Sequence, residues 1–494
     1  SAAEGQKDFN LYELVPSTTS AVFVTDDVLE FVAEVDELTC SKNQQYLYVS
    51  KLFSYLKQSL YALSEDTPHG LSRQMNQMLI SFHEPDNERN QVLYCRLGNG
   101  DKELVNRFVR KYISSLYPPK TFIYKGEEII IYPMADGDFL ACYLTSDFMA
   151  LSFQKKLIEN VIDAYKSGKS LADDSTFTGI RAPKKSAAAA TIYTRMQGMM
   201  GWTEFDMKMK DDFIYFSGIT HDADTCFAFI NQLRQQQSVK GFPGEVLPST
   251  AFYFSRQGIT DWVSLLSYGN AQGQSVPART SEVQNRDKEF SRYLMENAGQ
   301  DLVACLFQRE DTLQGAAAVL SLSVADVTEA ERMLRALVNA ASADEGRRNP
   351  RITFCYTVNK AYLIYRLPQT TLFEQLTSFA EPTLDVYAAF YGGRLLLAPD
   401  ADALAHYIRQ LDKGEVLNGA MAYQTGMDHL SDSYHFMLMA DFDHIFQQSE
   451  NHVRFVPDFF LRNADFFRHF TLFVQFACAD GVVYPNIVLK YKSE

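Results

Sequence analysis

The chain has 494 residues, of which 46% are hydrophobic and 22% charged, and its formal net charge is −15 at pH 7. At roughly 150 residues per domain, this length is too great for one ordinary domain. The composition is typical of a globular protein, and it excludes a disordered chain, a collagen-like chain and a coiled coil. The acidic balance argues against a nucleic-acid-binding protein, because such proteins present a basic face.

The start of the chain bears on membrane attachment. It begins Ser1-Ala2-Ala3-Glu4-Gly5 without a methionine, as a chain does after a signal peptide or anchor has been removed. No run of 18 or more apolar residues occurs, so no membrane span is predicted. We expect membrane attachment only through an N-terminal anchor that preceded Ser1.

The first half predicts short strands and a few amphipathic helices. The motif Pro16-Ser17-Thr18 leads into an apolar run and then a helix over 28–35. Apolar pairs that repeat every four residues indicate a second helix over 104–116. The β-rich runs within 122–153 are joined by tight turns such as Lys125-Gly126-Glu127, so we expect antiparallel hairpins.

A further helix is predicted over 154–166. The residues at its end, Lys166 to Ser170, suggest a phosphate-binding loop. That loop requires a glycine five residues before Gly168, where the chain has Asp163, and its helix follows the loop rather than precedes it. We therefore interpret Gly168 as the left-handed residue just past a helix C-terminus.

The second half repeats the first. Four segments recur in the same order, which predicts an internal duplication. The matched pairs are 14–18 with 246–250, 148–177 with 394–423, 187–194 with 433–440, and 205–219 with 473–487. Gly168 aligns with Gly414 at the end of the matched helices.

These elements predict an α+β fold of two similar lobes, 1–245 and 246–494, each a mainly antiparallel sheet with helices on one face. In the second lobe we expect a helix that begins near Asp326, with a capping box at Thr328. The polar stretches 269–289 and 341–350 lack periodicity and predict long loops. The seven cysteines stand singly, which favours buried free thiols over a disulfide framework.

One short run near the C-terminus suggests a metal site. Asp441, Asp443 and His444 have ligand chemistry, but on a strand the two aspartates face away from His444, and on a helix only Asp441 and His444 converge. The preferred interpretation is that Asp441 caps a helix over 442–447. A metal site at the three residues is the alternative.

An aromatic-rich insertion near 445–468 distinguishes the second lobe. Its phenylalanines are spaced as in a buried helical stripe, and an exposed surface for a partner, lipid or ligand is the alternative. They are Phe455, Phe459, Phe460, Phe466, Phe467 and Phe470. Of the two tryptophans, we expect Trp262, aligned with Phe31, to be buried, and Trp202 to be partly exposed with its N–H near water.

The repeated pattern resembles a family of uncharacterised Bacteroidetes cell-envelope proteins, internally duplicated and usually carrying an N-terminal anchor. The features that carry the resemblance are Pro-Ser-Thr before the first strand, a helix ending Gly-x-x-Leu, and paired strands closing each half. The resemblance implies an extracytoplasmic protein on the periplasmic side of the envelope. It brings no catalytic residues with it.

For function, we expect a non-enzymatic envelope protein that binds a partner protein or a ligand. None of the nucleophile-elbow, zincin, dinucleotide or calcium-loop motifs occurs, so no catalytic residue and no cofactor is predicted. Two alternatives stay open. One is a hydrolase-type enzyme with an unrecognised site in the cleft between the lobes. The other is a carrier of lipids or lipoproteins that uses the aromatic-rich insertion.

Overall fold

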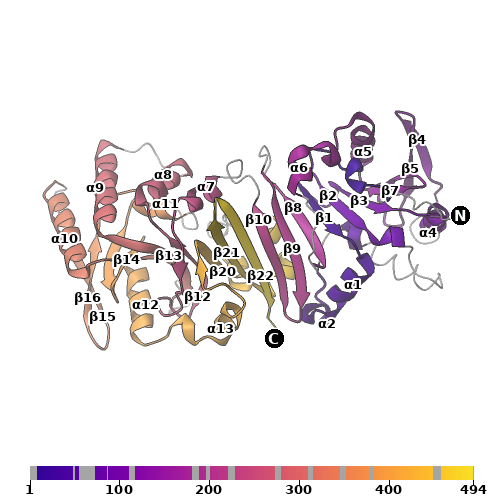
Figure 1. Ribbon diagram of the computed structural model, residues 1–494. Helices are drawn as coiled ribbons and strands as arrows, with labels where there is room; N and C mark the ends of the chain where they lie inside the picture. The colour runs from indigo at the N-terminus through magenta and orange to yellow at the C-terminus, as the bar shows by residue number, and fades with distance from the viewer. Residues whose placement is uncertain are drawn as a thin grey trace. The chain divides into compact units, whose positions relative to one another are not determined.

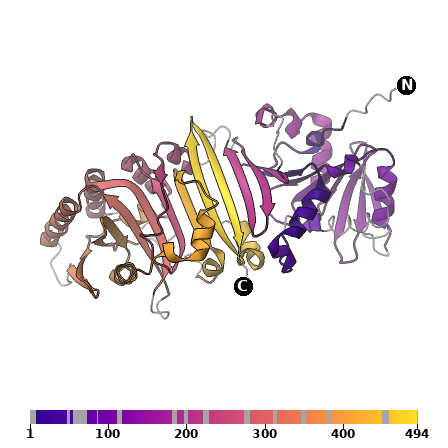
Figure 2. The same cartoon turned by 60° about the horizontal axis from the view of Figure 1, so that its bottom comes forward.

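The computed structural model describes residues 8–47, 51–54, 73–85, 87–110, 117–180, 188–195, 201–220, 228–272, 280–309, 315–344, 352–377, 383–448 and 458–492. The chain forms two compact units, Ser1–Cys226 and Phe227–Glu494, each of which mixes helices with antiparallel strands (Figures 1 and 2). None of the helices in these ranges combines the length and hydropathy needed to cross a membrane.

The strands of the first unit form one antiparallel sheet. They pair in the order β4-β5-β6-β7-β3-β2-β1-β8-β9-β10. Their bounds are β1 (Ala21–Thr25), β2 (Met78–Phe82), β3 (Gln91–Arg96), β4 (Lys120–Tyr124), β5 (Glu127–Pro133), β6 (Phe139–Leu144), β7 (Phe148–Ser152), β8 (Ala190–Thr194), β9 (Thr203–Lys210) and β10 (Phe213–Thr220).

The described helices of the first unit are η1 (Leu11–Leu14), α1 (Val28–Glu37), α2 (Thr39–Lys42), η2 (Arg73–Asn76), α4 (Asp101–Phe108), α5 (Lys155–Ser167), η4 (Leu171–Asp173) and α6 (Ser175–Ile180). The helix expected over 104–116 is present as α4, and its part beyond residue 110 lies outside the described residues.

The strands of the second unit pair in the order β15-β16-β17-β18-β14-β13-β12-β20-β21-β22, which matches the first unit position by position. A separate pair joins β11 to β19. Their bounds are β11 (Val239–Lys240), β12 (Ala251–Gly258), β13 (Ala298–Gln308), β14 (Ala316–Val324), β15 (Ile352–Tyr356), β16 (Ala361–Arg366), β17 (Tyr387–Tyr391), β18 (Arg394–Ala398), β19 (Ser433–Tyr434), β20 (Phe436–Asp441), β21 (Phe470–Ala479) and β22 (Val482–Tyr491).

The described helices of the second unit are α7 (Ala228–Arg234), α8 (Trp262–Gln272), α9 (Ser281–Asn297), α10 (Val327–Asp344), α11 (Leu372–Leu376), α12 (Ala401–Asp412), η6 (Leu417–Gly419), α13 (Met421–Met427), α14 (Phe442–Phe446), α16 (Asp458–Arg462) and α17 (Ala464–Phe467). The last three lie between β20 and β21, where the aromatic-rich insertion was predicted.

Helices cover both faces of each sheet, so the expectation of helices on one face is wrong. In β1, Val22 belongs to the core under α5, while its neighbour Phe23 points to the other face and meets Phe31 of α1 at 5.3 Å between ring centroids. In the second unit, Cys355 donates to a carbonyl of α12, whereas Tyr365 on the opposite face bonds to Glu331 of α10. A continuous apolar run such as 302–307 within β13 is typical of sheets buried on both faces.

The recurring Pro-Ser-Thr motif makes the same backbone contacts in both units. In the first unit, Leu171 N–H donates to Val15 C=O at 2.8 Å and Ser17 N–H donates to Lys169 C=O at 3.0 Å. In the second unit the corresponding bonds are Leu417 to Leu247 at 2.9 Å and Ser249 to Glu415 at 2.9 Å. In each unit, the Pro-Ser-Thr segment is therefore hydrogen-bonded to the residues that follow the helix ending Gly-x-x-Leu.

The helix ends agree with the sequence. Helices α5 and α12 occupy the predicted ranges, and Gly168 and Gly414 follow them with φ of 70° and 76°, a left-handed conformation that only glycine adopts freely. The tight turn at Lys125-Gly126 also has positive φ at both residues, as a two-residue hairpin turn requires.

Three local expectations are wrong. Residues 269–289 are not one loop, because α8 runs to Gln272 and α9 begins at Ser281. The stretch 341–350 begins inside α10. The cap of α10 is Asp326 rather than Thr328, because the Asp326 carboxylate accepts the Glu329 N–H at 3.2 Å.

The cysteines are free thiols, as expected. Cys95, Cys142, Cys305 and Cys355 are buried in strands and Cys478 is partly buried in β21. Cys40, in α2, is also buried, and Cys226 lies outside the described residues. Burial raises the pKa of the Cys95 and Cys142 thiols to about 12, which keeps them protonated and unreactive at neutral pH.

The exposed fractions of the two tryptophan side chains differ less than expected. Trp262 is 6% exposed and its indole N–H donates to Gly299 C=O at 3.2 Å. Its register with Phe31 is shifted by one turn, because both helices are capped by an aspartate, Asp27 and Asp261. An apolar stripe repeats after three residues, so a one-turn shift leaves the sequence pattern intact.

The prediction of a partly exposed Trp202 is wrong. Its side chain is 0% exposed and packs against Phe177 of α6, with ring centroids 5.1 Å apart. The Arg195 guanidinium lies 4.3 Å from the centre of the indole ring and covers it, while its Nε donates to Thr19 C=O. The Trp202 N–H has no hydrogen-bond partner in the described part of the chain.

These burials predict that Trp202→Ala and Trp262→Ala each lower the free energy of unfolding of their own unit by about 3–5 kcal/mol, because both leave a large cavity. Denaturant unfolding followed by circular dichroism measures the loss. Acrylamide should quench neither tryptophan efficiently in the native protein. A Trp202 that is quenched readily, or a Trp202→Ala loss under about 1 kcal/mol, would contradict the packing described.

Candidate functional site

The suspected metal residues form a capped helix end. The Asp441 carboxylate accepts the Asp443 N–H at 3.2 Å, as the predicted cap does, and lies 3.1 Å from His444 Nδ1. The Lys492 ammonium pairs with Oδ1 of Asp441, the oxygen that accepts the Asp443 N–H, whereas His444 faces Oδ2. Burial disfavours the charged carboxylate, but His444 and Lys492 together hold the pKa of Asp441 below its usual range.

Asp443 contributes its backbone N–H to this contact, and its side chain is exposed on α14. Among the described residues, no three His, Cys, Asp or Glu side chains are placed to hold a metal ion. A lysine already supplies the positive charge that Asp441 needs, which favours the interpretation of this residue as a helix cap.

A buried serine–histidine pair in the first unit has the chemistry of a nucleophile and its base. Ser81 Oγ lies 2.7 Å from His83 Nε2 and 2.8 Å from the Tyr94 hydroxyl. Ser81 and Tyr94 are fully buried beneath α5, so a substrate cannot reach the hydroxyl in this conformation. Burial lowers the pKa of His83 to about 4, and the three side chains form a hydrogen-bonded chain within the core.

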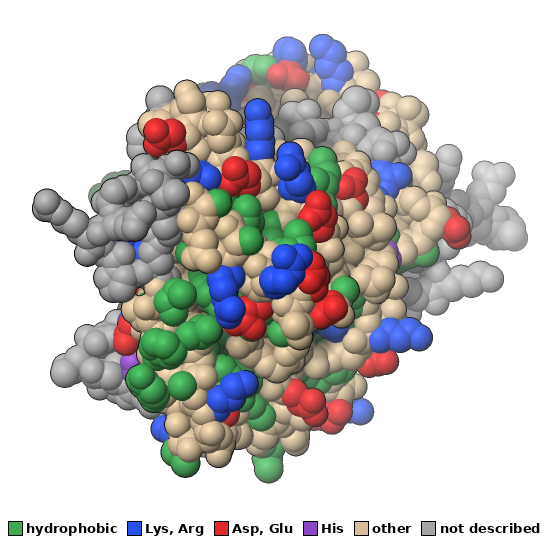
Figure 3. Space-filling model, turned by 90° about the vertical axis from the view of Figure 1, so that its left-hand side faces the viewer, with side chains coloured by type: hydrophobic (Ala, Val, Ile, Leu, Met, Phe, Trp, Pro, Cys, Tyr) green, Lys and Arg blue, Asp and Glu red, His purple; other side chains and the backbone are tan. Residues whose placement is uncertain are grey.

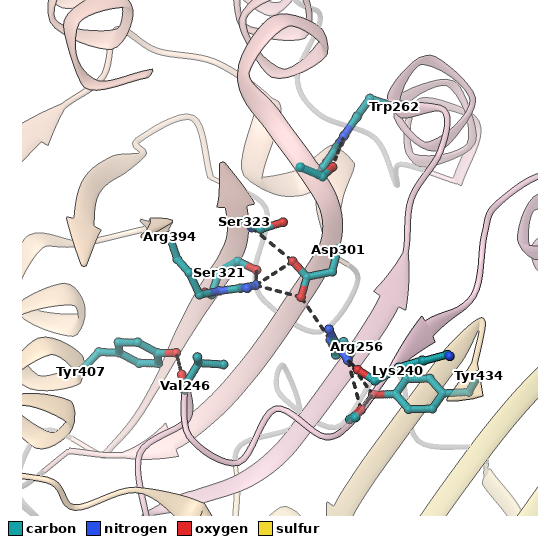
Figure 4. Close-up of polar contacts among 12 residues, drawn as sticks. Lys240, Val246, Arg256, Trp262, Asp301, Ser321, Ser323, Arg394, Tyr407 and Tyr434 are labelled. Carbon is teal, nitrogen blue, oxygen red and sulfur yellow. Dashed lines mark hydrogen bonds and ion pairs between the residues drawn. The ribbon is translucent and has the colours of Figure 1, made fainter. Parts of the chain in front are cut away.

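The second unit contains a buried cluster of charges that the sequence reasoning missed. Figure 4 shows Asp301 of β13 between Arg256 of β12 and Arg394 of β18. Arg256 Nε donates to Asp301 at 3.1 Å, and Arg394 Nη2 donates to both carboxylate oxygens at 3.0 and 3.1 Å. The backbone N–H of Ser323 in β14 donates to the same carboxylate at 3.2 Å.

This charge cluster ties the sheet to the segment that enters it. Arg256 Nη1 donates to Lys240 C=O at 2.9 Å and to the Tyr434 hydroxyl at 3.1 Å, and so joins β12 to β11 and β19. Burial opposes ionisation of Asp301, but the two guanidinium groups hold its pKa below the usual range. Charged residues at the ends of apolar strands were the signal available in the sequence.

A second buried carboxylate organises the other face of this unit. Asp287 of α9 accepts hydrogen bonds from the Thr370 and Thr371 hydroxyls, both at 2.6 Å, and from the Thr371 N–H at 2.8 Å. Gln375 donates to the Thr371 hydroxyl at 2.6 Å. These bonds join α9 to the start of α11, so this cluster also has a structural role.

The most exposed apolar residues of the second unit include those of its end strand. Ile352, Phe354 and Tyr356 alternate along β15 on one face and are 37%, 54% and 68% exposed. The Phe354 and Tyr356 rings stack with centroids 6.1 Å apart, and Val358 is exposed at the hairpin tip. We call Ile352, Phe354 and Tyr356 the β15 strip.

Figure 3 looks onto this end of the second unit. Apolar side chains gather in the lower part of the view, at the height at which β15 and β16 lie in Figure 1, with Lys and Arg side chains beside them. The other face of β15 is covered, because Cys355 is fully buried against α12. The exposed face is therefore a property of the sheet edge rather than of a loosely packed hairpin.

The end strand of the first unit is protected differently. In β4, Ile123 is exposed, but Lys120 and Lys125 flank the strand, and the Lys155 ammonium lies 4.5 Å from the centre of the Phe122 ring. Lysines at an edge strand deter pairing with other chains. Residues 352–356 of β15 include neither a charged residue nor a proline.

The phenylalanines of the aromatic-rich insertion pack mainly against one another, which favours a buried stripe over an exposed surface. Phe466, Phe467 and Phe470 are buried, although they lie on α17 and β21 rather than on one helix. Phe460 of α16 stacks against Phe442 and Phe467 at 5.1 and 4.9 Å. Phe455 and the side chain of Phe459 lie outside the described residues.

Comparison of the chain with protein-family models, with curated proteins and with solved structures finds no match.

The buried His83 predicts a specific acid sensitivity. In the unfolded chain this imidazole takes up a proton near its usual pKa of 6.5, whereas in the folded protein it does so only near 4. Stability is therefore intact above pH 6.5 and falls between pH 6.5 and 4, by about 3 kcal/mol from this group.

Urea unfolding of the first unit, measured at several pH values, tests this expectation. In His83→Gln the free energy of unfolding should depend less on pH across that window than in the wild-type chain. The difference between the two slopes isolates His83 from the carboxylates. Parallel slopes would contradict a neutral, buried His83.

The charge cluster predicts a large effect of removing its only carboxylate. Asp301→Asn keeps the shape but leaves Arg256 and Arg394 without their counter-charge, and should lower the free energy of unfolding of the second unit by about 3–5 kcal/mol. The matched control is Asp443→Asn, an exposed carboxylate, which should cost less than about 1 kcal/mol. Equal losses in the two variants would show that the cluster contributes little.

Proposed function

We propose that this protein is a non-enzymatic envelope protein that binds a partner protein through the β15 strip. The observation that carries the proposal is the exposure of Ile352, Phe354 and Tyr356 on one face of an end strand whose other face is buried. Grouped apolar side chains on a folded surface mark interaction sites, whereas single ones are ordinary. Aromatic residues are also enriched at protein interfaces.

The polar clusters support a binding protein over an enzyme. Ser81 and His83 are buried, and Asp301 and Asp287 have their oxygens occupied by arginine, threonine and backbone donors. Each of these groups is used to hold strands or helices together. The hydrolase stays a prediction. The lipid or lipoprotein carrier also stays a prediction, although the packed phenylalanines favour a core role for the aromatic-rich insertion.

The proposal includes an origin of the two units by duplication. It is supported by the matched strand orders, by the same Pro-Ser-Thr backbone bonds and by left-handed glycines after equivalent helices. Strands β4 and β15 occupy corresponding end positions in the sheets of the two units. Strand β4 itself includes Lys120, whereas residues 352–356 of β15 follow Arg351 but include no charge. This difference fits a binding role retained in the second unit only.

We place the protein on the periplasmic side of the cell envelope, with attachment through an N-terminal anchor. This placement rests on the resemblance of the repeated pattern to the Bacteroidetes envelope family. The net charge of −15 supports a protein partner rather than a nucleic acid.

Site-specific photo-crosslinking tests the proposed function. A photoreactive phenylalanine analogue is placed at Phe354 in the full chain, in the cells that make the protein, and at Ile123 of β4 as the matched control. We expect a discrete adduct with an envelope protein from position 354, absent from position 123 and lost when Tyr356→Lys is added. The same adducts from both positions, or none from 354, would contradict the proposal.

A further inference from the structure

The backbone of β15 has an open edge. Among the described residues, this strand pairs only with β16, in the register Ile352↔Tyr365 to Tyr356↔Ala361. Thr357 N–H donates to Lys360 C=O at 2.9 Å and so closes the hairpin with a hydrogen-bonded pair. In an antiparallel pair such residues alternate with residues whose backbone groups point outward.

Counting back from Thr357 assigns the direction of every group in the strand. Cys355 and Thr353 point their N–H and C=O toward β16, while Tyr356, Phe354 and Ile352 point theirs toward the open edge. The Tyr356 C=O accepts a bond from Arg409 Nε at 3.4 Å, as an outward group should. The backbone groups of Ile352 and Phe354 have no such partner within the described residues.

The same residues therefore expose both kinds of binding group. Within the part of the chain that the structure describes, Ile352 and Phe354 present backbone donors and acceptors without a partner along the edge, and apolar side chains on the adjoining face. An extended peptide that adds to an edge gains affinity from main-chain hydrogen bonds and specificity from alternate side chains.

The charge of the β15–β16 hairpin indicates which charge a bound peptide carries. Residues 352–366 include Lys360 and Arg366 but neither Asp nor Glu, in a chain with 61 acidic and 46 basic residues. Lys360 lies over the Tyr362 ring at 5.1 Å, close to the tip of the hairpin. Two carboxylates, Asp412 and Glu331, contact the hairpin at Asn359 and Tyr365, and two further arginines, Arg335 and Arg409, contact it at Tyr365 and Tyr356. The local balance stays positive and is complementary to an acidic segment. The net charge of −15 opposes pairing with a second copy of the chain.

We propose that the partner supplies an extended segment of alternating apolar and acidic residues, which adds to the β15 edge as a further strand of the sheet. The proposal rests on the proposed function, because it identifies how the partner occupies the β15 strip. The apolar side chains of the partner's segment cover Ile352 and Phe354, and its main chain pairs with the backbone groups of these two residues. The carboxylates of the segment approach Lys360 and Arg366.

The test uses the full chain and two synthetic ten-residue peptides, one alternating valine with glutamate and one alternating valine with lysine. Binding is measured by fluorescence anisotropy of the labelled peptide. Phe354→Lys removes the apolar contact. Phe354→Ala removes the phenyl ring but keeps the outward N–H. Phe354→Pro removes both without touching the pairing with β16, and proline is tolerated at sheet edges. Ile123→Lys and Ile123→Pro make the same changes in β4.

We expect the glutamate peptide to bind and the lysine peptide to bind at least about tenfold more weakly. Phe354→Lys should weaken binding about tenfold, and Phe354→Pro should weaken it about tenfold more than Phe354→Ala, which is equivalent to one further lost contact of ordinary strength. The Ile123 variants should not weaken binding. Unchanged circular dichroism and thermal midpoints keep loss of binding distinct from misfolding.

Other outcomes overturn the inference. Equal loss in Phe354→Ala and Phe354→Pro would mean side-chain docking without strand addition, and the proposed function would stand. Equal binding of both peptides would contradict the role of charge. Binding of neither peptide would contradict the proposed alternating segment, even if the crosslinking finds a partner at position 354. A wild-type dimer that Phe354→Pro dissociates would make a second copy the occupant.

Discussion

In each unit, the position of the covering helix depends on a short backbone bridge between the segment that enters the central strand and the turn after that helix. Val15 and Leu171 form it in the first unit, and Leu247 and Leu417 in the second. The bridge requires a chain that reverses immediately after the helix, which glycine with positive φ allows. Helices α5 and α12 are thereby set over their sheets, and the hydrogen-bonded chain of Ser81, His83 and Tyr94 lies beneath α5.

An open antiparallel sheet must end in strands whose backbone is paired on one side only, and this constraint creates the edge that we propose as the surface for a partner. Natural sheets protect such edges with charges, prolines or covering segments. The first unit follows this rule with Lys120 and Lys125. In the second unit, Arg409 covers only the last carbonyl of β15, and the apolar residues before it are exposed.

Local signals predicted the elements with strong periodicity or a distinctive turn, such as α5, α12 and the hairpins. Helix α9 was missed because one position of its buried stripe is Asp287, whose charge is compensated by Thr370 and Thr371 far along the chain. Trp202 was misassigned because Arg195, which covers it, gives no local sign of doing so. The alternation in 352–356 predicts two unlike faces, but not that the sheet ends beside them.

Hydrogen exchange of individual backbone amides in residues 352–356 of the native full-length chain tests the open edge most directly. Amides that bond to β16 must open before they exchange, whereas outward amides at a free edge exchange rapidly. The account predicts fast exchange at Ile352 and Phe354 and strong protection at Thr353 and Cys355. Protection of Phe354 equal to that of Cys355 would show that the edge is already occupied, and would contradict the assignment of β15 as the binding strand.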